Sequence, residues 1–217
     1  MLEVVFFAVA VALVGHYLRQ MSPGRPARVG AKTVSGELTQ LVEYADRAYL
    51  EKKYLSAEKL YLKILKIDHK NASAYRRIGL IYSAQRKYPD AIESFQVAAH
   101  LDPSAVNYYN LGVTYYENAN YIKAIAAFDK GLIFDQTPDL YDAIGRTQLN
   151  LNHPNEAVEA FEKATANPKN KQHLTHLAEA YELVGKKDLA KVTYEKILKI
   201  DPKDVKAARA LRRPATV

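Results

Sequence analysis

The sequence contains no cysteine among its 217 residues. Disulfide bridges, thiolate metal sites and cysteine nucleophiles are therefore excluded. Glycine is also sparse, because its nine residues are scattered singly along the chain and never form a phosphate-binding loop. Serine and aspartate residues fall mainly at expected turns and helix caps, not in a catalytic arrangement. We therefore predict a protein that is not an enzyme and needs no cofactor.

The chain has little net charge outside its two ends. Residues 1–36 carry a formal charge of +3 and residues 202–217 carry +4, out of a total of +7 for the whole chain. The long segment between these ends is therefore neutral. A nucleic-acid-binding protein usually presents a continuous basic surface, so a basic nucleic-acid-associated protein is only a second alternative. Such a protein would bind DNA or RNA with a steep salt dependence.

A repeated pattern of small and aromatic residues occupies most of the chain. Alanines recur at intervals of 34, 33, 33 and 33 residues, and an aromatic residue follows each of them by four positions. The alanines are Ala57, Ala91, Ala124, Ala157 and Ala190, and the aromatic residues are Tyr61, Phe95, Phe128, Phe161 and Tyr194. Spacings of three and four between apolar residues predict amphipathic helices. The fixed period predicts that pairs of such helices stack on one another.

This pattern resembles the tetratricopeptide repeat (TPR). The third copy carries the motif of this family most completely, in Tyr108, Leu111, Gly112, Tyr115, Ala124 and Phe128. The glycine of the motif is replaced by Ala45 in the first copy and by Ala178 in the last. The resemblance implies an all-α TPR solenoid of about five helix–turn–helix repeats. We place the repeats at residues 38–71, 72–104, 105–137, 138–170 and 171–202, followed by a capping helix and basic tail at 203–217.

The N-terminal segment is apolar over a length that suits a membrane. Residues 4–15 contain no polar side chain, and a helix over residues 2–18 would be about 26 Å long, against ~30 Å for the bilayer core. We predict a single transmembrane anchor helix at residues 1–18 and a basic, flexible linker rich in proline and glycine at residues 19–37. Glu3 precedes the apolar run where a signal peptide would have basic residues. Cleavage of this segment nevertheless stays an open alternative.

The basic residues near this segment all follow it, which predicts its orientation. Arg19, Arg25, Arg28 and Lys32 lie on the C-terminal side of the apolar run. By the positive-inside rule, the repeats then lie in the cytoplasm. The overall plan is similar to that of the bacterial inner-membrane TPR proteins that regulate envelope assembly. The resemblance therefore implies a single-pass protein of the bacterial inner membrane.

The resemblance also implies a partner-binding groove lined by the first helix of each repeat, in which TPR proteins hold an extended peptide or a helix. The residues predicted to line it are Arg76, Leu80, Tyr109, Asn110, Val113, Tyr116, Asp142, Arg146, Asn150 and Glu179. They combine rings, amides and cations, which are residue types enriched at binding sites. The family's carboxylate clamp is incomplete, because Leu80, Asp139 and Ala143 replace three of its polar positions. A solvated face without a ligand stays the alternative.

Two histidines, His173 and His176, are three residues apart, a spacing that could place both on one metal ion. No third ligand is evident, so we predict two surface histidines and no metal site. The function predicted for the chain is a membrane-tethered scaffold that binds a protein or peptide partner and contacts the lipid bilayer through residues 2–18. A homo-oligomer is compatible with this prediction. The alternative is an exported TPR subunit of a secretion or envelope-assembly complex.

Overall fold

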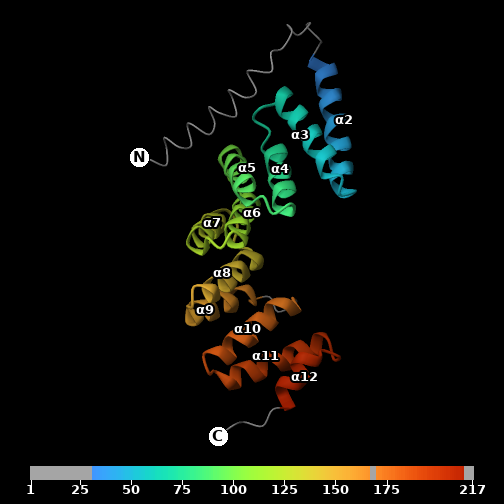
Figure 1. Cartoon of the computed structure of the whole chain (residues 1–217). Coiled ribbons are helices and arrows are strands. Elements are labelled where there is room, and N and C mark those ends of the chain that lie inside the picture. The colour runs from blue at the N-terminus through green and yellow to red at the C-terminus, as the bar shows by residue number, and fades with distance from the viewer. Residues whose placement is uncertain (1–30, 167–169, 213–217) are drawn as a thin grey trace, which may run out of the picture. The chain divides into compact units, whose positions relative to one another are not determined.

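The computed structural model describes residues 31–166 and 170–212, and shows the chain as a succession of helices (Figure 1). The anchor predicted at residues 1–18 lies outside the described residues, as do residues 19–30 of the predicted linker. The chain divides into two compact units, residues 1–74 and 75–217, which we describe separately. Within the described ranges there are 11 helices and no strand, so the all-α prediction is confirmed. None of these helices is long and apolar enough to cross a bilayer.

The first unit contains one hairpin of two helices, α2 (Ala31–Leu50) and α3 (Tyr54–Ile67), which pack against each other. Ala45 on α2 and Ala57 on α3 are both fully buried. The Tyr61 hydroxyl donates a hydrogen bond of 2.6 Å to Asp46 Oδ1 and ties the two helices together.

The predicted linker ends earlier than expected. Helix α2 begins at Ala31, so the part of the predicted flexible linker from residue 31 to residue 37 is helical, and that prediction was wrong there. Gly36 lies inside this helix and was read as a linker residue. A single glycine within a helix costs only about 1 kcal/mol, which neighbouring packing offsets.

The second unit is a stack of helix pairs, and its helices follow the predicted repeats. They are α4 (Ala72–Ala84), α5 (Tyr88–Leu101), α6 (Ala105–Glu117), α7 (Tyr121–Phe134), α8 (Pro138–Asn150), α9 (Pro154–Ala164), α10 (Lys171–Leu183), α11 (Lys187–Ile200) and α12 (Val205–Arg212). Side chains cap several of these helices: Ser104 Oγ accepts from the Asn107 amide, and Thr137 Oγ1 accepts from the Leu140 amide. Proline at the first position of α8 needs no such donor, which suits a helix start.

The alanine ladder lies at the centre of the helix pairs, as the repeat pattern predicted. Ala91, Ala124 and Ala157 have no exposed surface, and Ala190 has 3%. The aromatic ring that follows each alanine by four residues is also buried, with 3% exposure or less. Small side chains at these positions allow the paired helices to approach closely enough for the rings to fill the space between them.

The turn inside each hairpin uses the same backbone conformation. One residue per turn adopts a positive φ, namely Lys52, Arg86, Ala119, Asn152 and Gly185. The amide of the next residue donates to the carbonyl five positions earlier, at 2.8 Å in the bond from Asn120 to Tyr115 and 2.9 Å in the bond from Lys87 to Tyr82. This is the Schellman arrangement, which satisfies carbonyl groups left free at the end of a helix.

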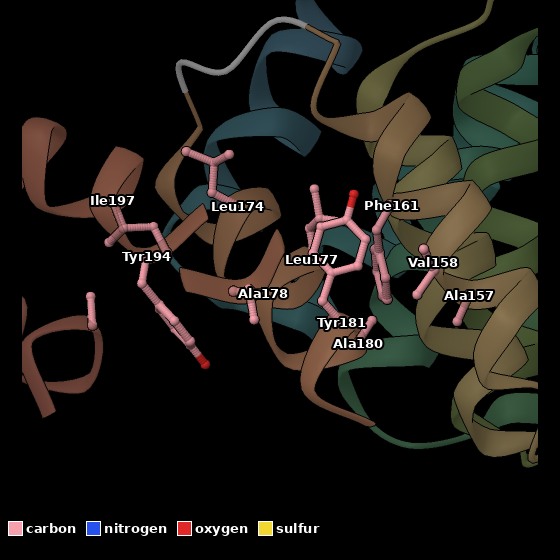
Figure 2. Close-up of a cluster of buried hydrophobic side chains, with 12 residues drawn as sticks. Ala157, Val158, Phe161, Leu174, Leu177, Ala178, Ala180, Tyr181, Tyr194 and Ile197 are labelled. Carbon is pink, nitrogen blue, oxygen red and sulfur yellow. The ribbon is translucent and has the colours of Figure 1, made fainter. Parts of the chain in front are cut away.

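Two clusters of buried apolar side chains hold the second unit together. One cluster is formed by residues of α5 to α9, and the other by residues of α9 to α12. Figure 2 shows that α10 carries side chains toward both neighbours: Leu177 and Tyr181 lie near Phe161 of α9, whereas Leu174 lies on the side of Ile197 of α11. Helix α12 covers the far end of this cluster with Ala207, which is 1% exposed. The predicted solenoid of stacked helix pairs is thus confirmed.

Candidate functional site

The first helices of successive repeats lie next to one another, because α8 contacts both α6 and α10. This places side chains from three repeats on one surface, which we call the first-helix face. We define it by Tyr109, Asn110, Val113, Tyr116, Asp142, Arg146, Asn150 and His176. All but His176 were predicted from the sequence as lining residues. That this face holds a partner remains a prediction.

Arg146 lies at the centre of the first-helix face and is held from two sides. Its Nε donates a hydrogen bond of 3.1 Å to Asp142 Oδ2, one helical turn earlier on α8. Its guanidinium carbon lies 5.6 Å from the centre of the Tyr116 ring on α6. A cation at this distance from an aromatic face is attracted by the ring. The guanidinium is therefore fixed by a carboxylate of its own helix and a ring of the preceding repeat.

Asp142 extends the chain of contacts to the next repeat. Its second oxygen, Oδ1, lies 2.6 Å from His176 Nδ1 on α10. Asp142 is only 5% exposed, so both of its oxygens meet partners in a largely water-free site. The His176 ring also lies 5.6 Å from the Phe161 ring. Tyr116, Arg146, Asp142 and His176 therefore form one continuous chain of contacts across three repeats.

The histidine prediction was wrong in its placement of both side chains at the surface. His173 is 6% exposed, with its Nε2 3.2 Å from the Asp139 carboxylate, and the His176 side chain is 21% exposed. The physical reason is that α10 packs between its neighbours and turns this pair toward α8. In the part of the chain that the structure describes, no three histidine, aspartate or glutamate side chains are grouped as metal ligands.

Tyr116 is itself positioned by its neighbours. Its hydroxyl accepts a hydrogen bond of 3.0 Å from Asn150 Nδ2, which also donates to the Arg146 carbonyl at 3.0 Å. The Tyr116 ring meets the Tyr121 ring edge-on, with 5.6 Å between their centres. Asn150 thus joins α8 to α6 at the edge of the face. The ring beneath Arg146 has a defined orientation as a result.

Tyr109 is half-buried and closes the other side of the face. Its ring lies 6.0 Å from the Phe128 ring, and it packs with Val113 against the core of the second unit. Burial raises the pKa of Tyr109, Arg146 opposes this shift, and Asp139 and Asp142 add to it. These effects show that Tyr109 shares one electrostatic environment with the charged groups of α8. Tyr109 and Val113 therefore serve partly as packing residues and not only as exposed ligands.

The remaining predicted residues lie outside this chain of contacts. Arg76 and Leu80 are on α4, where Leu80 packs against the core of the second unit. Glu179 on α10 forms an ion pair with Lys206 of the capping helix. The sequence analysis missed His176 and Lys206. His176 could have been found, because it follows Asn110 by two periods of 33 residues and so occupies an equivalent position on its helix.

A stack of antiparallel helix pairs with adjacent first helices defines a helical-repeat protein. The tetratricopeptide repeat family matches residues 105–134, 138–170 and 174–204 through one family profile and residues 44–106 through another. Together these matches cover more than half of the chain, which therefore belongs to the tetratricopeptide repeat family. Repeats of this family mediate protein–protein interactions and are typically scaffolds, not enzymes.

Several known proteins are similar to this chain. MamA is 27% identical, with a TM-score of 0.67 over 75% of this chain and 96% of its own. YrrB, described as a TPR protein with an unusual peptide-binding site, is 19% identical, with a TM-score of 0.64 over 78% of this chain and 89% of its own. The transcription factor tau 131 kDa subunit of Saccharomyces cerevisiae is 33% identical over 73 residues. That match covers 34% of this chain, which spans only 7% of the yeast protein.

Proposed function

We propose that this protein is a membrane-tethered adaptor that binds a peptide or helix of a partner protein on its first-helix face. The observation that carries this proposal is the chain of contacts from Tyr116 through Arg146 and Asp142 to His176. These contacts hold charged and aromatic groups of three repeats in a fixed arrangement before any partner arrives. Side chains that are already ordered lose less entropy on binding, which favours affinity.

The composition of the face also supports binding of a peptide. Tyr109 and Tyr116 are partly exposed rings, and tyrosine and arginine are enriched among residues that dominate binding energy. Asn110 and Asn150 bring amide groups, which can both donate to and accept from a peptide backbone. The face therefore offers apolar area together with directional polar groups. A merely solvated surface needs neither.

A site-specific crosslinking experiment tests the location of binding. A photoreactive amino acid at Asn110, on the first-helix face, should form a discrete adduct in intact source cells. The same amino acid at Lys130, an exposed residue of the second helix α7, is the matched control and should form none. Equal labelling at both positions, or labelling at Lys130 alone, would contradict the proposed face.

The tether is supported by the sequence of residues 2–18, whose apolar length suits a bilayer and whose basic flank follows it. Under this proposal the repeats lie in the cytoplasm and collect their partner at the membrane. A reporter that is active only in the cytoplasm, fused after Val217, should be active. An inactive fusion, with activity from an exported reporter instead, would favour the alternative of an exported subunit. Removing residues 1–18 should move the protein from the membrane fraction to the soluble one.

A further inference from the structure

The guanidinium of Arg146 has donors to offer beyond its internal ion pair. An arginine carries five N–H donors in a planar fork, and Asp142 takes the one at Nε. The Arg146 side chain is 37% exposed, so it is accessible although it is anchored. The edge formed by its two terminal nitrogens matches the two oxygens of a carboxylate.

The surroundings of Arg146 restrict it to one orientation. The Tyr116 ring lies against the guanidinium, and the Tyr116 hydroxyl is in turn held by Asn150. Asp142 is anchored by His176 through its other oxygen, so this carboxylate is committed on both sides. A planar fork that is already oriented loses little freedom when it forms two parallel hydrogen bonds. A lysine at this position would carry the same charge without that geometry.

We propose that Arg146 binds the carboxylate of an aspartate or glutamate side chain in an extended partner peptide. This inference rests on the proposed function, because it names the chemistry that the first-helix face recognises. A side-chain carboxylate is favoured over a chain terminus. The reason is that Leu80, Asp139 and Ala143 replace the residues with which TPR clamps grip a terminal carboxylate.

Asp139 is the group that opposes such a ligand. It lies on the same helix as Arg146, its side chain is 69% exposed, and its charge reaches Tyr109. A peptide carboxylate near Arg146 is therefore repelled by Asp139 across the face. Replacing this carboxylate with an amide should strengthen the binding of an acidic peptide by a few-fold. The change Asp139→Asn thus tests the inference by a gain of affinity, which misfolding does not produce.

The inference can be tested with a displayed library of random short peptides and the full chain in detergent. Peptides selected by the wild-type protein should share an aspartate or glutamate. Changing that residue to asparagine or glutamine should weaken binding about tenfold or more, since a hydrogen bond between charged groups contributes ~1.5–3 kcal/mol. Amidating the peptide C-terminus should change little. The variant Arg146→Lys should bind the acidic and amide peptides almost equally, whereas Arg86→Lys, at a hairpin turn, should behave as wild type.

Three outcomes would overturn the inference while leaving peptide binding intact. The selected peptides could lack a shared acidic residue or be enriched in lysine and arginine. Discrimination between acid and amide could persist in Arg146→Lys while Asp139→Asn brings no gain. Binding could depend on the terminal carboxylate instead. If the wild-type protein selects no peptide at all, both the inference and the proposed function are wrong.

Discussion

The ring of Phe128 occupies the space in which Gly112 would carry a side chain. A Cβ placed on Gly112 would lie 2.9 Å from Cζ of that ring, closer than real side chains approach. The same relationship joins Gly79 to Phe95, where the Cε1 atom would lie at 2.9 Å. The phenylalanine of each second helix therefore packs directly on the glycine of the first helix in these repeats.

We expect Gly112→Ala to lower the free energy of unfolding by about 1–3 kcal/mol, the usual cost of overpacking a buried contact. Chemical denaturation followed by circular dichroism measures this change. Gly36→Ala is the matched control, because nothing lies within 4 Å of the new methyl group and the residue is inside a helix. It should leave stability unchanged or raise it by up to ~1 kcal/mol. A stabilising Gly112→Ala would show that the ring can move aside without cost.

The positive φ at each hairpin turn predicts a stabilising change. Ala119 has φ of 56°, a conformation that costs an L-residue roughly 1–2 kcal/mol and costs glycine little. We expect Ala119→Gly to raise the midpoint of thermal unfolding. Gly185→Ala, where φ is 74° and no atom would touch the new methyl, should lower it. Changes of the same sign in the two variants would contradict this account of the turns.

The link between Tyr181 and Glu162 predicts a loss of stability at high pH. Burial, followed by the hydrogen bond of 2.8 Å that the Tyr181 hydroxyl donates to Glu162 Oε1, raises the pKa of Tyr181 to about 12. In the unfolded chain the value is about 10. The folded state thus favours the protonated form, so this contribution is complete below pH ~10 and is lost as the pH rises toward about 12.

Tyrosinate absorbance should therefore show one late-titrating group in the wild type that is missing in Tyr181→Phe. Stability measured by denaturant should fall with pH less steeply in Tyr181→Phe over the same window. Glu162→Gln should lower the midpoint only in part, because burial is the larger cause of the shift. An unchanged titration curve in Tyr181→Phe would disprove the assignment.

The capping helix α12 should respond to acid. Asp204 accepts a hydrogen bond from the Ala207 amide at 3.0 Å, and Lys171 donates to its other oxygen at 3.0 Å. These contacts, in that order, lower the pKa of Asp204. Their stabilising effect is therefore present above the unfolded pKa of about 3.9 and is lost as the pH falls through the lowered value.

Hydrogen exchange resolved by residue should show α12 losing protection in acid before α10 does. In Asp204→Asn and in Lys171→Met this acid sensitivity should shrink, because each change removes part of the titrating contact. Acid sensitivity of α12 that is the same in both variants and the wild type would show that another group controls it.

The repeat pattern made the architecture predictable, since a period of 33 or 34 residues with small and aromatic positions leaves one arrangement that buries them. It also predicted that Tyr109, Tyr116 and Arg146 would come from helices on one surface. The start of α2 at Ala31 was not predictable in the same way, because the glycines and prolines before and within that region are typical of a linker. Local propensity there is overridden by the helix that the chain continues into.

The sequence alone determined that helices pair and stack, because that outcome depends on residue spacing and on the space that small side chains leave. Only the tertiary structure decided which polar groups meet. Asp142 and His176 are 34 residues apart, and their contact depends on the packing of α8 against α10 and on side-chain rotamers that no local pattern specifies. For the same reason a histidine expected at the surface is a member of the contact chain that orients Arg146.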